Sequence, residues 1–251
     1  MLFDDDFEVF LANTEESKKL HYALRYRVYC QETQFENSAQ FSDQLETDDL
    51  DRLSVHFIAR SKKTKEWLGA IRLIVSTLDE LPAFNLLPEN AFYRQRMKDE
   101  VNRSHARKAA EISRLCILGC YRKTGASLSN VQPQMEKEGD AVSMRQQPEV
   151  LLGLMRVAYK YCINNQIDIC LFTITKSLAK IMQRLSLNFI QAGEEVEHRG
   201  LRAPYYTYIP SFLGNVHLKS QTTYEMFMRE GYSFYDSRVA GRRRSLGESV
   251  I

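Results

Sequence analysis

Short stretches of the chain repeat hydrophobic side chains at the spacing of strands, and longer stretches repeat them at the spacing of helices. Residues 7–12 are a short apolar run in which Glu8 is the one polar position, and residues 14–30 carry apolar side chains three and four positions apart. This change of period predicts a short strand followed by an amphipathic helix. Residues 55–60 and 67–75 are β-branched or aromatic runs around the polar segment 61–66, which predicts a β-hairpin.

The rest of the chain predicts helices and strands in an order that is not a simple alternation. The expected elements are a basic helix over 89–109, a strand over 110–118, a helix over 150–162, a strand over 169–175, a helix over 177–187 and two closing strands within 188–210. We therefore predict one α+β domain over residues 1–211, followed by a helical extension and a loose tail over 212–251.

Two polar segments lack a sustained period. Residues 31–51 are rich in Gln, Asn, Ser and Asp, and we interpret them as a long surface loop of the kind that carries function. Residues 126–148 contain too few apolar side chains to bury much surface, and we interpret them as a mobile insertion.

Composition narrows the class of protein. With 44% apolar and 26% charged residues the chain is typical of globular proteins. The first thirty residues lack the pattern of a signal peptide, and the longest apolar runs are shorter than the roughly 20 residues that cross a bilayer. We expect a cytoplasmic protein without a transmembrane segment. The five cysteines show no metal-ligand spacing, so we expect reduced thiols and no metal site.

The net charge is only +2, but basic residues are clustered and would attract an acidic partner. These clusters comprise Arg94, Arg96, Lys98, Arg103, Arg107, Lys108, Arg122, Lys123 and Arg242 to Arg244.

Charged residues of the first half suggest a substrate site. Arg25 and Tyr29 lie four apart and share one helix face, although a solvated Arg beside a core Tyr fits the spacing equally well. Glu46, Asp48 and Asp51 could clamp a substrate ammonium group, and the alternative is a solvated acidic loop.

Charges inside apolar strands are harder to explain without a function. Arg72 interrupts one predicted strand, and Glu111 and Arg114 interrupt another, so some of these charges must be buried and paired. Residues three apart in a strand point to opposite faces, so Glu111 and Arg114 are same-face neighbours only if a β-bulge intervenes, which is also what an acyl-thioester site would use to expose backbone amides. The alternative is a structural ion pair with Arg72.

In this order the groups resemble the acyl-homoserine-lactone synthase family. The matching positions are Arg25, Tyr29, Phe35, Asp48, Asp51, Arg72, Glu111 and Arg114. Over roughly residues 5–212 the sequence looks more similar still to the acyltransferases associated with the PEP-CTERM/exosortase system. Phe35 stands in place of the family's tryptophan and Tyr29 in place of its phenylalanine, which favours an amino acid over S-adenosylmethionine as the acceptor amine.

The resemblance implies the GNAT fold, a twisted mixed sheet with helices on both faces and a splay that holds a pantetheine arm. Residues 122–126, with Arg122 and Lys123, only loosely match the family's phosphate loop, which favours acyl carrier protein over acyl-CoA as the donor. The basic helix would meet that acidic carrier. No tightly bound cofactor is implied.

The resemblance also implies roles in a direct acyl transfer from a thioester. Glu111 is the preferred general base, with Arg114 beside it and Glu46 as the second choice. Backbone amides near Leu115, Cys116 and Ile117 would hold the oxyanion. An apolar slot near Thr175 would take the acyl chain.

Three alternatives stay open from the sequence. The first is a true acyl-homoserine-lactone synthase that uses S-adenosylmethionine. The second is a non-catalytic module that binds acyl carrier or nucleic acid through its basic clusters, although we expect no nucleic-acid partner. The third is a covalent route through Cys116, for which no neighbouring histidine is predicted.

Overall fold

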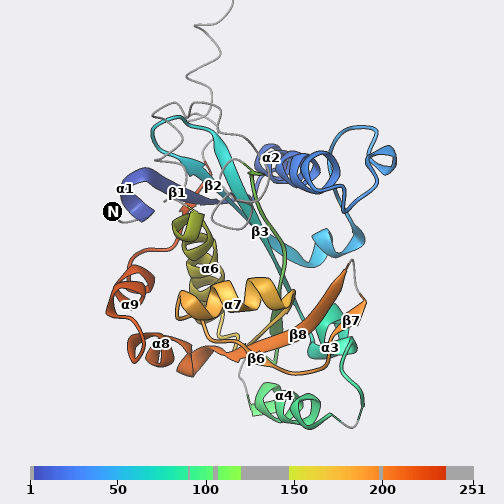
Figure 1. Cartoon of the computed structure of the whole chain (residues 1–251), viewed down its shortest axis with the longest axis vertical. Helices are drawn as coiled ribbons and strands as arrows, with labels where there is room; N and C mark the ends of the chain where they lie inside the picture. The colour runs from blue at the N-terminus through green and yellow to red at the C-terminus, as the bar shows by residue number, and fades with distance from the viewer. Residues whose placement is uncertain (1–2, 90, 104–106, 120–146, 198–199, 236–251) are drawn as a thin grey trace, which may run out of the picture.

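The computed structural model describes residues 3–89, 91–103, 107–119, 147–197 and 200–235 (Figure 1). The predicted mobile insertion and loose tail fall largely outside these residues, as do Arg122 and Lys123. No helix among the described residues combines the length and the apolar character that crossing a bilayer requires.

A single sheet of nine strands forms the centre of the fold, in the order β6-β8-β5-β4-β3-β2-β1-β9, with β7 paired to β8. The strands are β1 Phe7–Leu11, β2 Ser54–Ser61, β3 Trp67–Ser76, β4 Ala109–Ile117, β5 Ile169–Ile174, β6 Ile190–Gln191, β7 Val196–Glu197, β8 Leu201–Tyr208 and β9 Ser233–Phe234. Pairing is antiparallel except between β4 and β5 and between β1 and β9. The sheet is therefore mixed, as predicted.

Helices cover both faces of this sheet (Figure 1). They are α1 Phe3–Asp6, α2 Glu15–Tyr26, α3 Pro82–Asn85, α4 Phe92–Arg103, α6 Gln147–Asn164, α7 Lys176–Arg184, α8 Ile209–His217 and α9 Gln221–Met228. Successive strand residues point to opposite faces. Ile71 and Leu73 of β3 accordingly pack in the core with α6, whereas Ala70 packs with α2 and Ile74 packs with α3 and α4.

Several predicted boundaries shift in the structure. The helix expected over 14–30 is α2 followed by a π-helical turn, Arg27–Glu32, and the basic helix expected over 89–109 is the shorter α4. The C-terminal extension is helical as expected, but α8 spans position 211 and β9 adds a strand to the same sheet. The extension therefore packs as part of this fold.

The sheet opens between its two central parallel strands. β4 and β5 pair over three positions only, from Ala110 opposite Cys170 to Ile112 opposite Phe172. Both strands continue beyond that pairing, to Ile117 and Ile174 respectively. Beyond Ile112 and Phe172 the two strands are therefore not paired with each other.

Candidate active site

A cavity of about 210 Å³ lies in the opening between β4 and β5. Its walls are residues 111–117 of β4, residues 172–175 at the end of β5, and side chains that follow α2 in sequence, including Tyr29, Phe35 and Glu36. Arg202 from β8 and Leu178 from α7 complete it. Of the predicted substrate residues, Tyr29 and Phe35 line this cavity together with the donor-side residues of β4, whereas the cavity lining does not include Arg25, Asp48, Asp51 and Arg72.

A β-bulge shapes the β4 wall, in agreement with the spacing of Glu111 and Arg114. The register against β3 shifts between Ala70 and Arg72, opposite the segment from Ser113 to Cys116. Arg114 has a φ of 47°, in the left-handed region that side chains other than glycine adopt at a cost in strain. The Tyr29 hydroxyl donates a 2.9 Å hydrogen bond to the Leu115 carbonyl and thereby fixes the bulge from the helical side.

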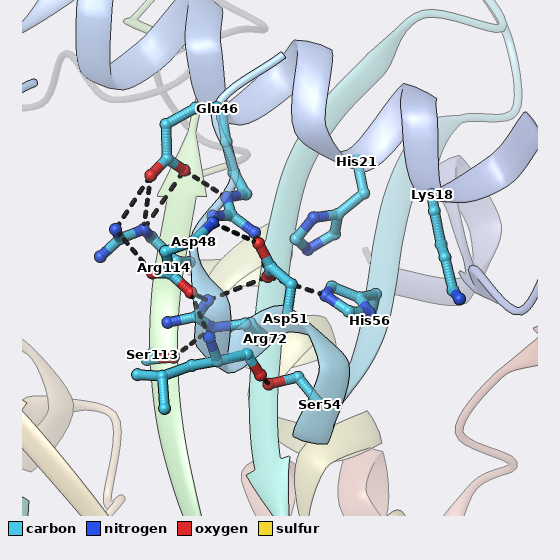
Figure 2. A network of polar contacts seen from close by, with 12 residues as sticks. Lys18, His21, Glu46, Asp48, Asp51, Ser54, His56, Arg72, Ser113 and Arg114 are labelled. Atoms are coloured by element: carbon cyan, nitrogen blue, oxygen red, sulfur yellow. Dashed lines mark hydrogen bonds and ion pairs between the residues drawn. The ribbon is translucent and has the colours of Figure 1, made fainter. Parts of the chain in front are cut away.

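Beside the cavity, a carboxylate joins two buried guanidinium groups (Figure 2). Arg25 donates from Nε to one oxygen of Glu46. Arg114 donates to the same carboxylate from Nε, at 3.0 and 3.2 Å, and from Nη2, at 2.9 Å. Glu46 and Arg25 are fully buried, so the alternative of a solvated Arg25 is wrong. The loop over residues 31–51 is otherwise mostly exposed, as predicted, and Glu46 is its one buried residue.

A second set of ion pairs is centred on Arg72 of β3 and shares Asp51 with Arg25. Arg72 donates to Asp48, to Asp51 at 2.9 Å, and to the Ser113 hydroxyl at 2.8 Å. Asp51 also accepts from Arg25 at 2.6 Å. Asp48 caps the short helical turn Asp49–Leu53, which explains why the loop returns its acidic residues to the sheet.

The electrostatics of this network hold Asp48 and Asp51 ionised. Burial alone would raise the pKa of Asp51, but a hydrogen bond with His56 and the charges of Arg25 and Arg72 hold that pKa far below its usual range. The pKa of Asp48 is also lowered, by Arg72 against the opposing effect of burial. Protein cations thus neutralise the acidic residues that we interpreted as an ammonium clamp, and a positioning role fits them better.

Glu111 occupies a different environment from these carboxylates. Its side chain is only 4% exposed, and its Oε2 accepts a 2.8 Å hydrogen bond from the backbone N–H of Ala83 in α3. Burial raises its pKa to about 7, against smaller lowering effects of the Ala83 hydrogen bond and of Arg72. Among the described residues, Arg72 forms its ion pairs with Asp48 and Asp51, so the alternative of a Glu111–Arg72 ion pair is wrong.

The predicted donor-side residues meet in the same cavity. Leu115, Cys116 and Ile117 form the β4 wall, and Thr175 lies opposite them, where its side chain caps the start of α7. Cys116 is buried in an apolar cluster, a setting more typical of an inert thiol than of a nucleophile.

The basic helix differs from its prediction at Arg94. This side chain is buried and donates to the carbonyls of Phe84 and Leu87, at 2.9 and 3.0 Å, so it anchors α4 rather than facing a partner. Two charged cavity residues, Glu36 and Arg202, were also not predicted from the sequence. Glu36 directly follows Phe35, which was a predicted site residue, and Arg202 lies in the segment HRGLRAPYY. Only these neighbouring residues could have indicated from the sequence that Glu36 and Arg202 belong to the site.

The fold is that of the GNAT acyltransferases. Residues 24–131 match the family model described as "Acetyltransferase (GNAT) domain". That match covers the loop, the hairpin and β4, which supply the ion pairs and one wall of the cavity; the wall formed by β5, α7 and β8 lies outside it.

Among solved structures, the chain is similar to BjaI, a CoA-dependent acyl-homoserine lactone synthase solved with MTA, with a TM-score of 0.57, 12% identity, and coverage of 92% of this chain and 93% of that chain. It is also similar to FeeM, an N-acyl amino acid synthase from uncultured soil microbes, with a TM-score of 0.50, 14% identity, and coverage of 84% and 96%. At these identities the likeness shows the fold. A search of curated proteins gives no match.

Proposed function

We propose that the protein is an N-acyltransferase that moves a fatty acyl group from a thioester of acyl carrier protein, or of coenzyme A, to the amine of a small molecule. The observation that carries this proposal is the buried carboxyl group of Glu111, whose pKa is raised to about 7 at the wall of the β4–β5 cavity. A base with a pKa near neutral is suited to accept a proton from an attacking amine.

The opening between β4 and β5 supports a thioester donor. An extended pantetheine arm can hydrogen-bond to the strand backbone that is left unpaired beyond Ile112, and the acyl chain can then extend toward the apolar side chains of Phe172 and Ile174. The sequence resemblance to the PEP-CTERM/exosortase-associated acyltransferases supports the same donor class and is part of the proposal.

The proposed reaction needs no covalent enzyme intermediate. The acceptor nitrogen attacks the thioester carbonyl carbon, a C–N bond forms, and Glu111 takes the proton that the nitrogen loses. Backbone N–H groups of the bulge near Leu115 to Ile117 stabilise the oxyanion. The C–S bond then breaks, the amide forms, and the proton passes to the departing thiolate.

In this scheme Arg114 and Glu46 hold other groups of the site in place and do not transfer the proton. Glu46 lies between two guanidinium groups, Arg25 and Arg114, so we infer that it holds the Arg114 side chain beside the cavity, in place of the role of second base. Arg72 holds Ser113, two residues from Glu111 on the same face of β4. The ion pairs therefore support the bulge rather than the proton transfer.

The test is mass spectrometry of lipid extracts from cells that express the wild-type protein or its Glu111→Gln variant, with Glu15→Gln, an 87% exposed position, as the matched control. We expect new N-acyl species with the wild type and the control and about 100-fold less with Glu111→Gln. An N-acyl amino acid names the expected acceptor, and an acyl-homoserine lactone would instead indicate S-adenosylmethionine. Equal product from Glu111→Gln would contradict the proposed base.

A further inference from the structure

A buried histidine, His56 of β2, lies behind the ion pairs of the candidate site (Figure 2). Its side chain is 1% exposed, and its Nε2 lies 3.1 Å from Oδ1 of Asp51. In the sheet, His56 pairs with Arg72 of β3, so the two side chains lie on the same face, and both contact the Asp51 carboxylate. No step of the proposed reaction uses His56.

The hydrogen-bonding role of His56 follows from its surroundings. Burial lowers the pKa of His56, Asp51 opposes that effect, and the charges of Arg25 and Arg72 add to it. A neutral imidazole carries one N–H, and an ionised carboxylate can only accept, so the proton lies on Nε2 and His56 donates to Asp51. His56 thus adds a hydrogen bond to the network without adding a charge.

A second buried histidine packs against the other side of His56. His21 of α2 is fully buried, and the centroids of the two rings lie 4.7 Å apart at an interplanar angle of 79°. The His21 Nε2 lies 3.4 Å from the carbonyl oxygen of Ile71, which can only accept, so this nitrogen is also a donor. Burial lowers the pKa of His21 well below its usual range, and His56 lowers it further. Two neutral rings therefore pack together, and His21 holds the His56 ring in the orientation that faces Asp51.

A neutral donor at this position fits the charge balance of the network. Three guanidinium groups and three carboxylates contact one another, and a fourth carboxylate, of Glu36, lies at their edge, 3.5 Å from Arg114. The three cations are Arg25, Arg72 and Arg114, and the three carboxylates are Glu46, Asp48 and Asp51. A further buried cation would carry a large desolvation cost. An imidazole N–H satisfies the carboxylate without that cost.

Two branches of the network meet at Asp51, and both end at the bulge of β4. In one branch, Asp51 accepts from Arg72, which donates to the Ser113 hydroxyl at 2.8 Å. In the other, Asp51 accepts from Arg25, which donates to the carboxylate that holds Arg114. Ser113 and Arg114 are adjacent in the segment where the register against β3 shifts. The position of Asp51 therefore bears on both of these bulge residues.

The bulge needs such support because its backbone is strained. Arg114 has a φ of 47°, and a side chain other than glycine keeps such a conformation only where the surrounding structure holds it. The proposed oxyanion donors, near Leu115 to Ile117, follow directly in the chain. Misplacing catalytic groups by about 1 Å can lower a rate by about 100-fold. A group that holds both branches is therefore expected to act on kcat rather than on substrate binding.

We propose that His56 is a positioning residue of the active site: its neutral Nε2–H fixes Asp51, and Asp51 fixes, through the two branches, the bulge that holds the oxyanion. This inference rests on the proposed function. The competing role for His56 is a purely structural one, in which it stabilises the fold as a whole and no part of the site in particular.

Steady-state kinetics and amide hydrogen exchange of four proteins test this role. They are the wild type, His56→Leu, which lacks the donor, His56→Gln, which keeps a neutral N–H donor, and Val216→Ala as the control. Val216 is fully buried in α8, outside the lining of the cavity, so its truncation lowers stability away from the site. Thermal unfolding gives a temperature at which all four proteins are folded. If His56→Leu does not fold, His56→Phe replaces it, because it also lacks the donor and fills the space with a ring.

We expect kcat of His56→Leu to fall about 10-fold, with the KM of donor and acceptor unchanged. His56→Gln should keep most of the wild-type kcat, and Val216→Ala should keep all of it despite a lower midpoint of thermal unfolding. Exchange in peptides that cover residues 109–117 should become about 10-fold faster in His56→Leu and stay unchanged in Val216→Ala, because only the first loosens the bulge.

Wild-type kcat and unchanged exchange in His56→Leu would overturn the proposal. Equal losses in His56→Gln and His56→Leu would also overturn it, since the N–H donor would then have no role. Faster exchange throughout the protein would make His56 purely structural. Hydrogen exchange does not depend on turnover, so an absence of acyl transfer in the wild type would contradict the proposed function, while the exchange of residues 109–117 would still decide whether His56 positions the bulge.

Discussion

The side chain of Glu111 and the backbone N–H of Ala83 share a 2.8 Å hydrogen bond that links β4 to α3. Because α3 lies against β5 and β8, this bond fixes the carboxyl group from the far side of the opening between the strands. The hydrogen bond favours the ionised carboxylate, but burial has the larger effect and raises the pKa of Glu111 to about 7. Glu111 is thus oriented and able to exchange a proton near neutral pH.

The first prediction concerns the pH dependence of the rate. The carboxylate is the form that accepts a proton, so kcat/KM of the wild type should rise with pH and level off above about 7, where Glu111 is ionised. Ionisation of the acceptor amine adds its own rise at higher pH in every variant. A pH profile of Glu111→Gln isolates the carboxyl group, because only the inflection near pH 7 should disappear. The same inflection in both proteins would assign it to another group.

The second prediction concerns stability, and its sign follows from the raised pKa. Between pH 4.5 and about 7 the folded protein holds a proton on Glu111 that the unfolded chain has lost. The stabilising contribution is complete below pH 4.5 and is lost as the pH rises through about 7. The loss amounts to about 3 kcal/mol. Glu111→Gln stays neutral, so urea unfolding should show its stability relative to the wild type increasing across this window. Parallel curves for the two proteins would contradict the raised pKa.

The third prediction addresses the carboxylate that joins Arg25 and Arg114. Glu46→Gln removes the charge between two buried guanidinium groups, which the amide cannot replace. We expect a loss of about 3 kcal/mol in the free energy of unfolding, as for other broken buried ion pairs. Glu15→Gln should change it by less than about 0.5 kcal/mol, because that pair is exposed. Urea titration of both variants tests this, and equal stability would remove the structural role of Glu46.

The strands that build the site could be predicted because their patterns are local. β-branched runs set the hairpin, and the spacing of Glu111 and Arg114 within one strand allowed them to share a face only through a bulge, which is present as a register shift against β3. Burial of Glu46 could not be predicted in the same way. Its loop has no hydrophobic period, and its place depends on guanidinium groups contributed by residues 25 and 114.

Other features depend on contacts that no local pattern encodes. Arg94 is part of a basic run in the sequence. Its guanidinium is nevertheless buried, and it donates hydrogen bonds to two backbone carbonyls that precede it in the chain. Arg202 lies near the start of β8, between the apolar residues Leu201 and Ala203. Its side chain lines the cavity because β8 pairs with β5. Such residues can be assigned to the site or to the core only once the order of the strands and their packing are known.

The last prediction concerns the hydrogen bond between Tyr29 and the bulge. Tyr29→Phe removes the donor to the Leu115 carbonyl while keeping the ring in place, and one such bond contributes about 1 kcal/mol to stability. If this bond positions the bulge amides that hold the oxyanion, kcat should fall about 10-fold with little change in the KM of the acceptor. Tyr26→Phe is the control, since the Tyr26 ring packs against Phe41 at a centroid distance of 6.4 Å. Steady-state kinetics and thermal unfolding of both variants decide between the roles. A loss of stability without a change in kcat would make the Tyr29 hydroxyl purely structural, and a rise in KM alone would place that hydroxyl in acceptor binding.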